Sequence, residues 1–330
     1  MTGYLPKVFR RACCNGRAGF LICTSALMAL LGVVQPAMAQ HAGFDYGLSP
    51  QQIAPGVYVL IGRSEDFSTT NGGNIVNTGF IIGSEGVIVV DSGPSLHYGK
   101  QLRQAIAAIT PLPIVLVLNT HQHPDHFLGN QAFPAPTLAA LAQTRLAIET
   151  EGATLLDNMY RLNGAWMSDT VVVLPERTLE AGALDIGGRR LQLFVLSGHT
   201  EADLAVLDLA TGTLFAADLA FFQRAPTTPH ADIGRWLQAL DQLERIPFQR
   251  LVPGHGPVSE GGAPLARTRD YLRWLEQTMR DGAEQGMDMT EMLAVPVPAH
   301  FNALAEVRTE YRRSVIHLYP AAERAALKGP

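Results

Sequence analysis

The sequence predicts a mixed α/β (α+β) protein in which two β-sheets pack together with helices on the outside. Short apolar runs rich in β-branched residues alternate with segments of helical periodicity. These predicted strands and helices form two similar series, one on each side of residues 138–169. Metal-capable side chains follow several of the predicted strands, which is typical of functional loops held by a rigid scaffold.

The first residues predict an export signal that is not part of the fold. Four basic residues between Lys7 and Arg17 precede an apolar stretch, residues 20–34, that is short for a membrane span. Ala37-Met38-Ala39 then fits an A-x-A cleavage site. We therefore expect a signal peptide over residues 1–39, cleaved after Ala39, and a periplasmic or secreted product. The general export route is favoured over the twin-arginine route, and an uncleaved anchor is the alternative.

Signal cleavage would change the composition of the chain. All three cysteines lie in the signal, so the mature chain would have neither a disulfide framework nor a cysteine metal ligand. The formal charge of −5 would become −9, because the signal carries four basic residues and no acidic ones. Such a surface repels phosphate backbones, so no nucleic-acid partner is expected. No later apolar run has the length of a membrane helix, so no membrane partner is expected after cleavage.

The predicted elements follow one another along the mature chain. Strands are expected at residues 53–61, 75–82, 87–90, 114–118, 171–174, 191–196, 204–209, 214–217 and 250–252. Helices are expected at residues 97–109, 138–160, 233–246, 265–279 and 301–327, the second of them interrupted near Gly152. Because the pattern after Val258 is mostly helical, we divide the mature chain into a main domain, residues 40–260, and a C-terminal helical extension, residues 261–330.

The segment Thr120–His126 follows a predicted buried strand and carries the strongest chemical signal. Four metal-capable side chains occur in it: His121, His123, Asp125 and His126. Alternate side chains of an extended segment share a face, so the first two histidines point the same way. Pro124 can begin a helix that places the other two ligands in its first turn. Two ligand pairs suit two metal ions, and imidazole with carboxylate favours Zn, Fe or Mn over Ca or Mg.

The segment matches the HxHxDH signature, and the chain resembles the metallo-β-lactamase-fold hydrolases. Four further motifs of that family occur in its order: Asp91 before Ser92-Gly93, His199 in Ser-Gly-His-Thr, Asp218 after an apolar run, and His255 in Pro-Gly-His-Gly-Pro. Residues 119–133 are also similar to zinc metallohydrolases encoded beside periplasmic quinoprotein and sulfur-oxidation systems. The resemblance implies an αββα metallo-β-lactamase sandwich with C-terminal helices, a small-molecule substrate, and proteins of those pathways as partners.

The resemblance also implies two metal sites. The implied ligands are His121, His123 and His199 for site one, Asp125, His126 and His255 for site two, and Asp218 as a bridge. Two zinc ions, with iron or manganese as alternatives, would then lie ~3.5–4 Å apart. Glyoxalase-II-like thioesterases, lactonases and phosphodiesterases of this fold use this set. The β-lactamase branches mostly lack the bridging Asp, so a typical β-lactamase is not expected.

The implied chemistry is hydrolysis by a metal-bound water. Between two zinc ions the pKa of water falls far below that of bulk water, to roughly 7, and the hydroxide can attack an ester, thioester or lactone. Asp125 is the candidate proton acceptor, although a metal ligand is a poor base. Asp91 has no metal role in the family, and we expect it to orient a ligand imidazole or its loop.

Substrate contacts are predicted only from proximity in sequence. Trp166, Met167, Phe221 and Phe222 flank the metal motifs and are the candidates for an apolar pocket wall, although such residues are more often core. His230 is expected to lie outside the pocket. No basic cluster that would clamp a carboxylate is evident.

Two other functions stay open. One is a mononuclear iron, persulfide-dioxygenase-like oxidoreductase, which the complete second ligand set disfavours. Diiron oxygen reductases of the fold usually have Glu at the place of His123. The other is a non-catalytic accessory factor of a periplasmic quinoprotein or sulfur-oxidation pathway, in which closed metal sites would be structural.

Overall fold

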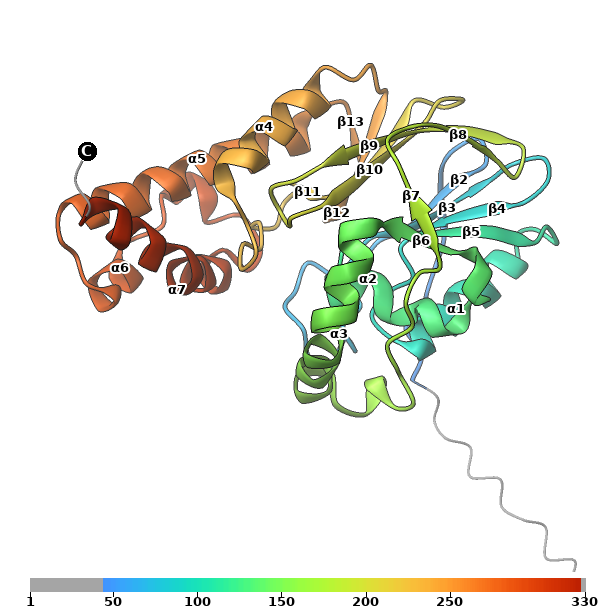
Figure 1. Cartoon of the computed structure of the whole chain (residues 1–330), viewed down its shortest axis with the longest axis horizontal. Coiled ribbons are helices and arrows are strands. Elements are labelled where there is room, and N and C mark those ends of the chain that lie inside the picture. Colours follow the sequence, from blue (N-terminus) through green and yellow to red (C-terminus); the bar gives the residue numbers. More distant parts are fainter. Residues whose placement is uncertain (1–43, 328–330) are drawn as a thin grey trace, which may run out of the picture. The chain divides into compact units, whose positions relative to one another are not determined.

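The computed structural model describes residues 44–327, which contain two β-sheets packed face to face with helices on both outer faces (Figure 1). The predicted αββα sandwich is therefore confirmed. The expected signal peptide, residues 1–39, and its cysteines lie outside the described residues. Within residues 44–327, no helix has both the length and the apolar character needed to cross a membrane.

The first sheet has seven strands in sequential order. They are β1 (Gln51–Ala54), β2 (Val57–Leu60), β3 (Thr78–Ile82), β4 (Val87–Val90), β5 (Ile114–Asn119), β6 (Leu138–Leu141) and β7 (Arg177–Leu179). The pairs from β1 to β4 are antiparallel, and those from β4 to β7 are parallel. Parallel neighbours need crossover connections, so the helices on this side of the sandwich join β4 to β5 and β6 to β7.

The second sheet has six strands in the order β13-β12-β11-β10-β9-β8. They are β8 (Gly182–Ile186), β9 (Arg189–Leu196), β10 (Asp203–Asp208), β11 (Thr213–Phe221), β12 (Arg250–His255) and β13 (Ser259–Glu260). Only β11 and β12 pair in parallel, and a helix connects them. Residues 203–208 and 213–221 are buried throughout, so β10 and β11 form the centre of this sheet.

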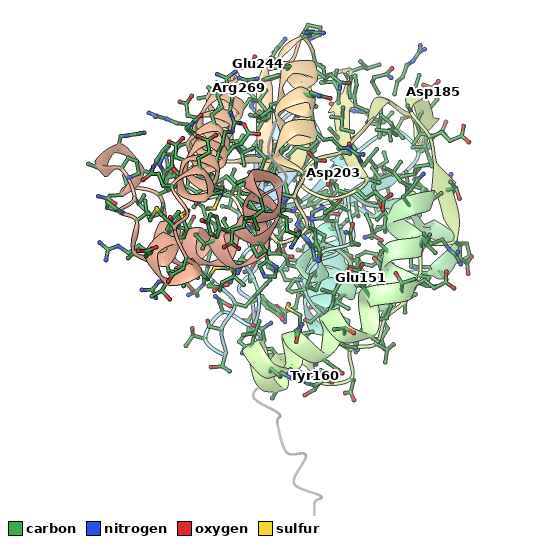
Figure 2. The ribbon with its side chains drawn as sticks, turned by 60° about the vertical axis from the view of Figure 1, so that its left-hand side comes forward. Glu151, Tyr160, Asp185, Asp203, Glu244 and Arg269 are labelled. Atoms are coloured by element: carbon green, nitrogen blue, oxygen red, sulfur yellow. The ribbon has the colours of Figure 1, made fainter. Side chains whose placement is uncertain are left out.

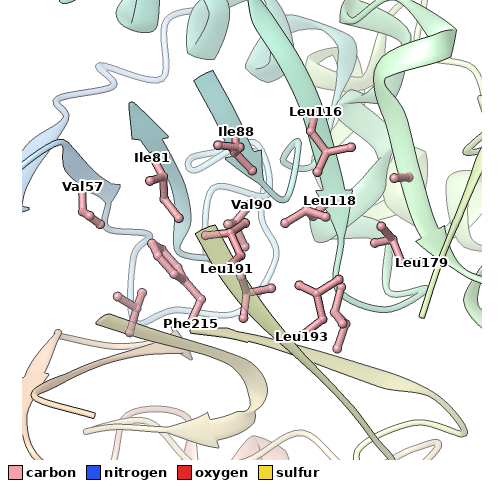
Figure 3. Close-up of a cluster of buried hydrophobic side chains, with 14 of the residues drawn as sticks. Val57, Ile81, Ile88, Val90, Leu116, Leu118, Leu179, Leu191, Leu193 and Phe215 are labelled. Carbon is pink, nitrogen blue, oxygen red and sulfur yellow. The ribbon is translucent and has the colours of Figure 1, made fainter. Parts of the chain in front are cut away.

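Apolar side chains from both sheets fill the space between them (Figure 3). Ile81 and Leu116 of the first sheet lie in one buried cluster with Leu191 and Phe215 of the second. Each such side chain contributes about 1.5–3 kcal/mol by leaving water. A Cβ on Gly79 would lie 2.5 Å from the Phe215 ring, so the missing side chain at this position makes room for the phenylalanine.

Helices cover both outer faces of the sandwich (Figure 1). The α-helices are α1 (Leu96–Ala107), α2 (Pro124–Phe127), α3 (Ala142–Asn163), α4 (Ile233–Glu244), α5 (Ala263–Glu284), α6 (Met289–Ala294) and α7 (Val307–Ala326). Short 3-10 helices are η1 (Leu128–Ala132), η2 (Ala135–Thr137), η3 (Gly164–Met167) and η4 (Ala299–Phe301). On the first sheet, Leu102 of α1 packs against Val89, and on the second, Trp236 of α4 packs with Leu214.

Helix α5 belongs to the sandwich and to the C-terminal helices at once. Leu272 lies in the cluster that covers the second sheet, whereas Met279 lies in a cluster with residues of α6 and α7. Arg269 ties α5 to α4, with Nη2 3.0 Å from Asp241 and the guanidinium also bonded to Glu244 (Figure 2). The proposed domain boundary at residue 260 falls between β13 and α5, and the division itself stays a prediction.

Several predicted elements differ from those observed. Residues 53–61 form two strands instead of one, because Gly56 adopts a left-handed turn conformation with φ +74°. Residues 138–141 form β6 instead of helix, since a run of four buried apolar residues fits a strand as well as a helix. Helix α3 continues through Gly152, and residues 171–174 form no strand. The last predicted helix begins only at Val307.

Candidate metal centre

The seven predicted ligands meet at one edge of the sandwich, where strand ends place them. His121 and His123 follow β5, and Asp125 and His126 lie in α2, directly after Pro124 at the first helical position. The other three ligands come from the second sheet: His199 after β9, Asp218 in β11 and His255 at the end of β12. All seven side chains are buried.

The first group of ligands consists of His121, His123, His199 and Asp218. Their ligand atoms all lie within 4.8 Å of one another. His199 Nε2 is 2.9 Å from His123 Nδ1 and 3.3 Å from Asp218 Oδ2. His121 Nε2 is 4.0 Å from the same carboxylate oxygen. Ligand atoms about 2.0–2.2 Å from a tetrahedral ion lie roughly 3.3 Å apart, so these spacings fit one ion.

The second group consists of Asp125, His126 and His255. Asp125 Oδ2 lies 3.8 Å from His126 Nε2 and 3.6 Å from His255 Nε2. Asp218 also faces this group, with Oδ1 3.2 Å from His126 Nε2 and Oδ2 3.3 Å from His255 Nε2. The Asp218 carboxylate therefore lies between the two groups.

Several atoms of the site lack a hydrogen bond although they are buried. Within residues 44–327, His121 Nε2, His126 Nε2 and Asp218 Oδ1 are such atoms, although the last two face each other at 3.2 Å without hydrogen-bond geometry. A buried polar atom without a partner costs about 1–3 kcal/mol. These atoms point toward the other ligands, and metal ions bound there would give each of them a partner. The donor set therefore fits divalent metal ions.

Backbone conformation brings Asp218 to this place. The pairing of β11 with β12 shifts register near Ala217, which has φ +46°. A Cβ on Gly254 would lie 1.9 Å from Asp218 Oδ1. The glycine of the Pro-Gly-His-Gly-Pro motif thus makes room for the carboxylate, while the next residue supplies a ligand.

Asp91 holds the segment that carries the HxHxDH ligands. Its carboxylate accepts hydrogen bonds from the Thr120 backbone N–H at 2.8 Å and the Thr120 hydroxyl at 2.9 Å. Asp91 Oδ2 also lies 2.8 Å from His126 Nδ1, which leaves Nε2 of that ring toward the ligands. Asp91 has φ +61°, a left-handed conformation that Asp tolerates better than most residues.

Asp203 holds the loop that carries His199. Its carboxylate accepts from the His199 N–H at 3.1 Å, the Thr200 N–H at 3.0 Å and the Thr200 hydroxyl at 2.7 Å (Asp203 is labelled in Figure 2). Burial raises the pKa of Asp203 to about 7, although these hydrogen bonds oppose the shift. Asp203 belongs to none of the family motifs. Its position four residues after His199 is the only feature of the sequence that indicates its role.

The protonation states of four of the seven ligands suit metal binding. Burial lowers the pKa of His121 and His123 well below the ordinary value and that of His199 to about 3, so these imidazoles are neutral at pH 7. Burial acts against ionisation of Asp218, but His255, His126 and His199 hold its pKa well below the ordinary value. Neutral imidazole and ionised carboxylate are the forms that bind metals. For His126, burial lowers the pKa, but the carboxylates of Asp91, Asp218 and Asp125 raise it well above the ordinary value.

A cavity of about 220 Å³ opens onto the centre. We call its metal side the ligand wall; it contains His123, Asp125, Asp218 and His255. We call the facing side the outer wall; it contains Asp66, Phe67, Leu155, Met159, Leu162, Arg224, Thr227, His230 and Arg313. The cavity therefore has metal-capable groups on one side and a mixture of apolar and charged groups on the other.

The four aromatic or sulfur-containing residues predicted for the pocket do not line this cavity. Met167 lies in a buried cluster beside α3, and Trp166 packs on Tyr46. Phe221 stacks on the imidazole of His255 at 5.1 Å and so supports a ligand from behind. Phe222 is half-buried and does not line the cavity.

His230, by contrast, corrects our expectation, because it lines the cavity and lies 2.8 Å from His123. The two arginines of the outer wall were also missed. Arg224 is buried and pairs with Glu310 of α7 at 3.2 Å. Arg313, one turn further along α7, reaches Asp66 at 3.0 Å. Since the two residues of each ion pair are far apart in sequence, no local motif predicts these pairs.

Comparison with known proteins agrees with the fold. Residues 71–255 match the model of the Metallo-beta-lactamase superfamily, and the chain belongs to this family. The linear primary-alkylsulfatase of Pseudomonas sp. (strain ATCC 19151) is 23% identical over 71% of this chain and 52% of its own length. This chain thus spans about half the length of that relative. The beta-lactamase-like protein 2 homolog of Drosophila melanogaster is 24% identical, over 71% of this chain and 74% of its own.

Solved structures show the same fold. The metallo-beta-lactamase from Pontibacter korlensis superposes with a TM-score of 0.55 at 21% identity, covering 68% of this chain and 99% of its own. The structure of TMB-1 gives a TM-score of 0.54 at 18% identity, covering 69% of this chain and 98% of its own. Members of the superfamily are mostly hydrolases, and the ligand groups of this chain fit that chemistry.

Proposed function

We propose that this protein is a periplasmic, dinuclear zinc hydrolase that acts on a small ester, thioester or lactone. The position of Asp218 supports this most directly. Its Oδ1 lies 3.2 Å from His126 Nε2, and its Oδ2 lies 3.3 Å from His199 Nε2, so one carboxylate faces both ligand groups. A bridging carboxylate of this kind holds paired ions in dinuclear hydrolases.

The zinc ions would supply an activated water at neutral pH and would polarise the bond to be cleaved. The chain's own side chains would hold the metal ions and orient the reacting groups. His121 and His199 stay neutral because burial disfavours their charged forms. Asp125 lines the cavity beside the other ligands, where its carboxylate can take up a proton released in hydrolysis. Asp125 is therefore the proposed proton acceptor.

The size and lining of the cavity support a small, partly apolar substrate. Its volume of about 220 Å³ is below the ~300–1,000 Å³ of pockets for drug-sized ligands. Phe67, Leu155 and Leu162 offer apolar surface to an acyl or alkyl group. The signal peptide predicted over residues 1–39 supports export, and the similarity of residues 119–133 supports partners in quinoprotein or sulfur-oxidation pathways.

A sulfate ester is the second candidate substrate. One relative is named a linear primary-alkylsulfatase, and Arg224 and Arg313 line the cavity beside apolar side chains. Both arginines already pair with Glu310, at 3.2 and 2.7 Å, which reduces the positive charge available to a sulfate. Substrates with an ester, thioester or lactone carbonyl group therefore remain the first candidates.

The test is hydrolysis by the mature protein loaded with zinc. The panel contains aryl esters, thioesters, lactones and alkyl sulfates of matched chain length, and His121→Ala is the inactive control. We expect turnover of at least one carbonyl substrate and none by the control. Turnover of alkyl sulfates alone would select the second candidate. No turnover of any substrate, together with oxygen uptake on persulfide by iron-loaded protein, would contradict the hydrolase.

A further inference from the structure

His123 is held from both sides by other histidines. Its Nδ1 lies 2.9 Å from His199 Nε2, among the ligand atoms of the first group. Its Nε2 lies 2.8 Å from Nδ1 of His230. His230 is exposed and belongs to the loop between β11 and α4, whereas His123 is buried. An exposed histidine therefore contacts the outer nitrogen of a buried ligand.

A neutral imidazole has one protonated nitrogen and one nitrogen free to bind a metal. In His123 the nitrogen nearest the other ligands is Nδ1, and when Nδ1 binds a metal, Nε2 carries the hydrogen. Nε2–H then donates to Nδ1 of His230. The remaining nitrogen of His230 carries that ring's own hydrogen, so both rings are neutral in this arrangement.

Two other ligands have their outer nitrogen satisfied in the same way. His126 Nδ1 lies 2.8 Å from the Asp91 carboxylate, and His255 Nδ1 donates to the backbone carbonyl of Ile75 at 2.8 Å. Such partners fix the tautomer and orientation of a ligand ring. We propose that His230 is the corresponding positioning residue for His123. It is not a further ligand in this reading, since its nitrogens belong to neither group of mutually close ligand atoms.

The loop that carries His230 is held by α7. The hydroxyl groups of Thr228 and Ser314, both fully buried, lie 2.7 Å apart. The Thr227 hydroxyl donates to Glu310 at 2.8 Å. These contacts keep the loop, and with it His230, against the ligand wall. Helix α7 lies beyond residue 255, where the match to the family ends. Helix α7 thus contacts the loop of His230, and His230 in turn contacts the ligand His123.

The experiment measures zinc affinity of the mature protein by competition with a chromophoric chelator. The variants are His230→Ala, which removes the acceptor, and His230→Asn, whose side-chain oxygen can take the place of Nδ1. His300→Ala is the control, because His300 is also exposed but packs on Phe301. Loss of a group that orients a ligand costs about 10–100-fold in metal affinity, so we expect at least about a 10-fold loss in the alanine variant. The asparagine variant should recover most of the lost zinc affinity, and the zinc affinity of the control should match that of the wild type.

A spectroscopic readout separates positioning from a general effect on the fold. In the zinc-loaded wild type, nitrogen-15 NMR of the imidazoles should show His123 bound through Nδ1 with a hydrogen on Nε2. In His230→Ala this signal should shift or broaden, while the unfolding transition of the metal-free protein stays unchanged because the replaced side chain is exposed. Equal zinc affinity in the wild type and His230→Ala, or a loss that asparagine does not restore, would overturn the inference.

The inference rests on the metal site of the proposed function, and the readouts keep the two apart. A wild type that binds no zinc would overturn both. A zinc-binding wild type without ester turnover would contradict only the hydrolase, because the affinity difference does not depend on any substrate.

Discussion

The two walls of the cavity are built in different ways. The ligand wall comes from short motifs at strand ends of the sandwich, each readable in a few neighbouring residues. The outer wall is assembled from distant segments: Arg224 and Glu310, for example, pair across 86 residues of sequence. Metal chemistry in this molecule is thus encoded locally, whereas the shape and charge of the substrate side depend on how α7 packs.

The walls also differ in how their charges are satisfied. On the ligand wall, Asp218 Oδ1 is buried and has no hydrogen bond among the described residues. Behind the outer wall, Glu310 accepts from Arg224, Thr227 and Arg313 through Oε1, while its Oε2 and Arg224 Nε have no hydrogen bond among the described residues. The ligand wall should therefore respond mainly to metal, and the outer wall mainly to loss of its own ion pairs.

The largest effect on stability should follow Arg224→Met. The Arg224 and Glu310 side chains are 1% and 0% exposed, so the variant leaves a buried carboxylate short of a partner. Breaking a buried pair in this way costs about 3–5 kcal/mol. Denaturant unfolding should show that loss. Arg235→Met is the control, because its pair with Asp232 is exposed, and little change is expected. Equal stability of the two variants would mean that the outer wall does not depend on this pair.

On the ligand wall, Asp91→Ala should weaken metal binding by about 10–100-fold, the usual cost of losing a group that orients a ligand. The variant removes the partner of His126 Nδ1 and two hydrogen bonds to Thr120. Asp91→Asn should lose less, since Asn tolerates the left-handed backbone and keeps an acceptor oxygen. Competition with a chromophoric chelator measures the zinc affinity of both variants. If Asp91→Ala binds zinc as tightly as the wild type, Asp91 does not orient the site.

A smaller effect should appear in the pH dependence of stability. Burial raises the pKa of Glu310 above its ordinary value of 4.5, although Arg224 and Arg313 oppose the shift. The folded protein then binds this proton more tightly than the unfolded chain, so stability is lost as the pH rises from 4.5 through the raised pKa. The melting temperature of Glu310→Gln should fall less than that of the wild type over this interval. Parallel curves for the two proteins would contradict the assignment.

The smallest effect concerns the apolar part of the outer wall. Leu162→Ala removes surface that a substrate chain would contact, and each lost CH2 contact is expected to raise KM roughly fourfold. The effect should grow with acyl chain length and leave kcat nearly unchanged. Leu146→Ala is the matched control, since Leu146 is also exposed on α3 but does not line the cavity. An equal change in both variants would show that Leu162 does not contact the substrate.

These differences explain what could be predicted from the sequence. The sandwich and the close grouping of the metal-capable side chains could be predicted, because strand-end motifs and apolar periodicity are local signals. His230 was misjudged, since its contact with His123 spans 107 residues and depends on a loop fixed by α7. Met167 and Phe221 are candidates for the pocket wall only by their neighbours in sequence, and their side chains have the commoner role of such residues, in the core. Leu138–Leu141 was misassigned because four apolar residues fit a buried strand or a helix equally well.

The most direct test of the account is the metal content of the mature protein, purified without chelator, beside Asp218→Ala. The carboxylate facing both ligand groups predicts about two zinc ions per chain in the wild type and a clear loss in the variant. About one iron per chain would contradict the dinuclear hydrolase and favour an oxidoreductase. No bound metal in either protein would contradict the assignment of the ligands themselves.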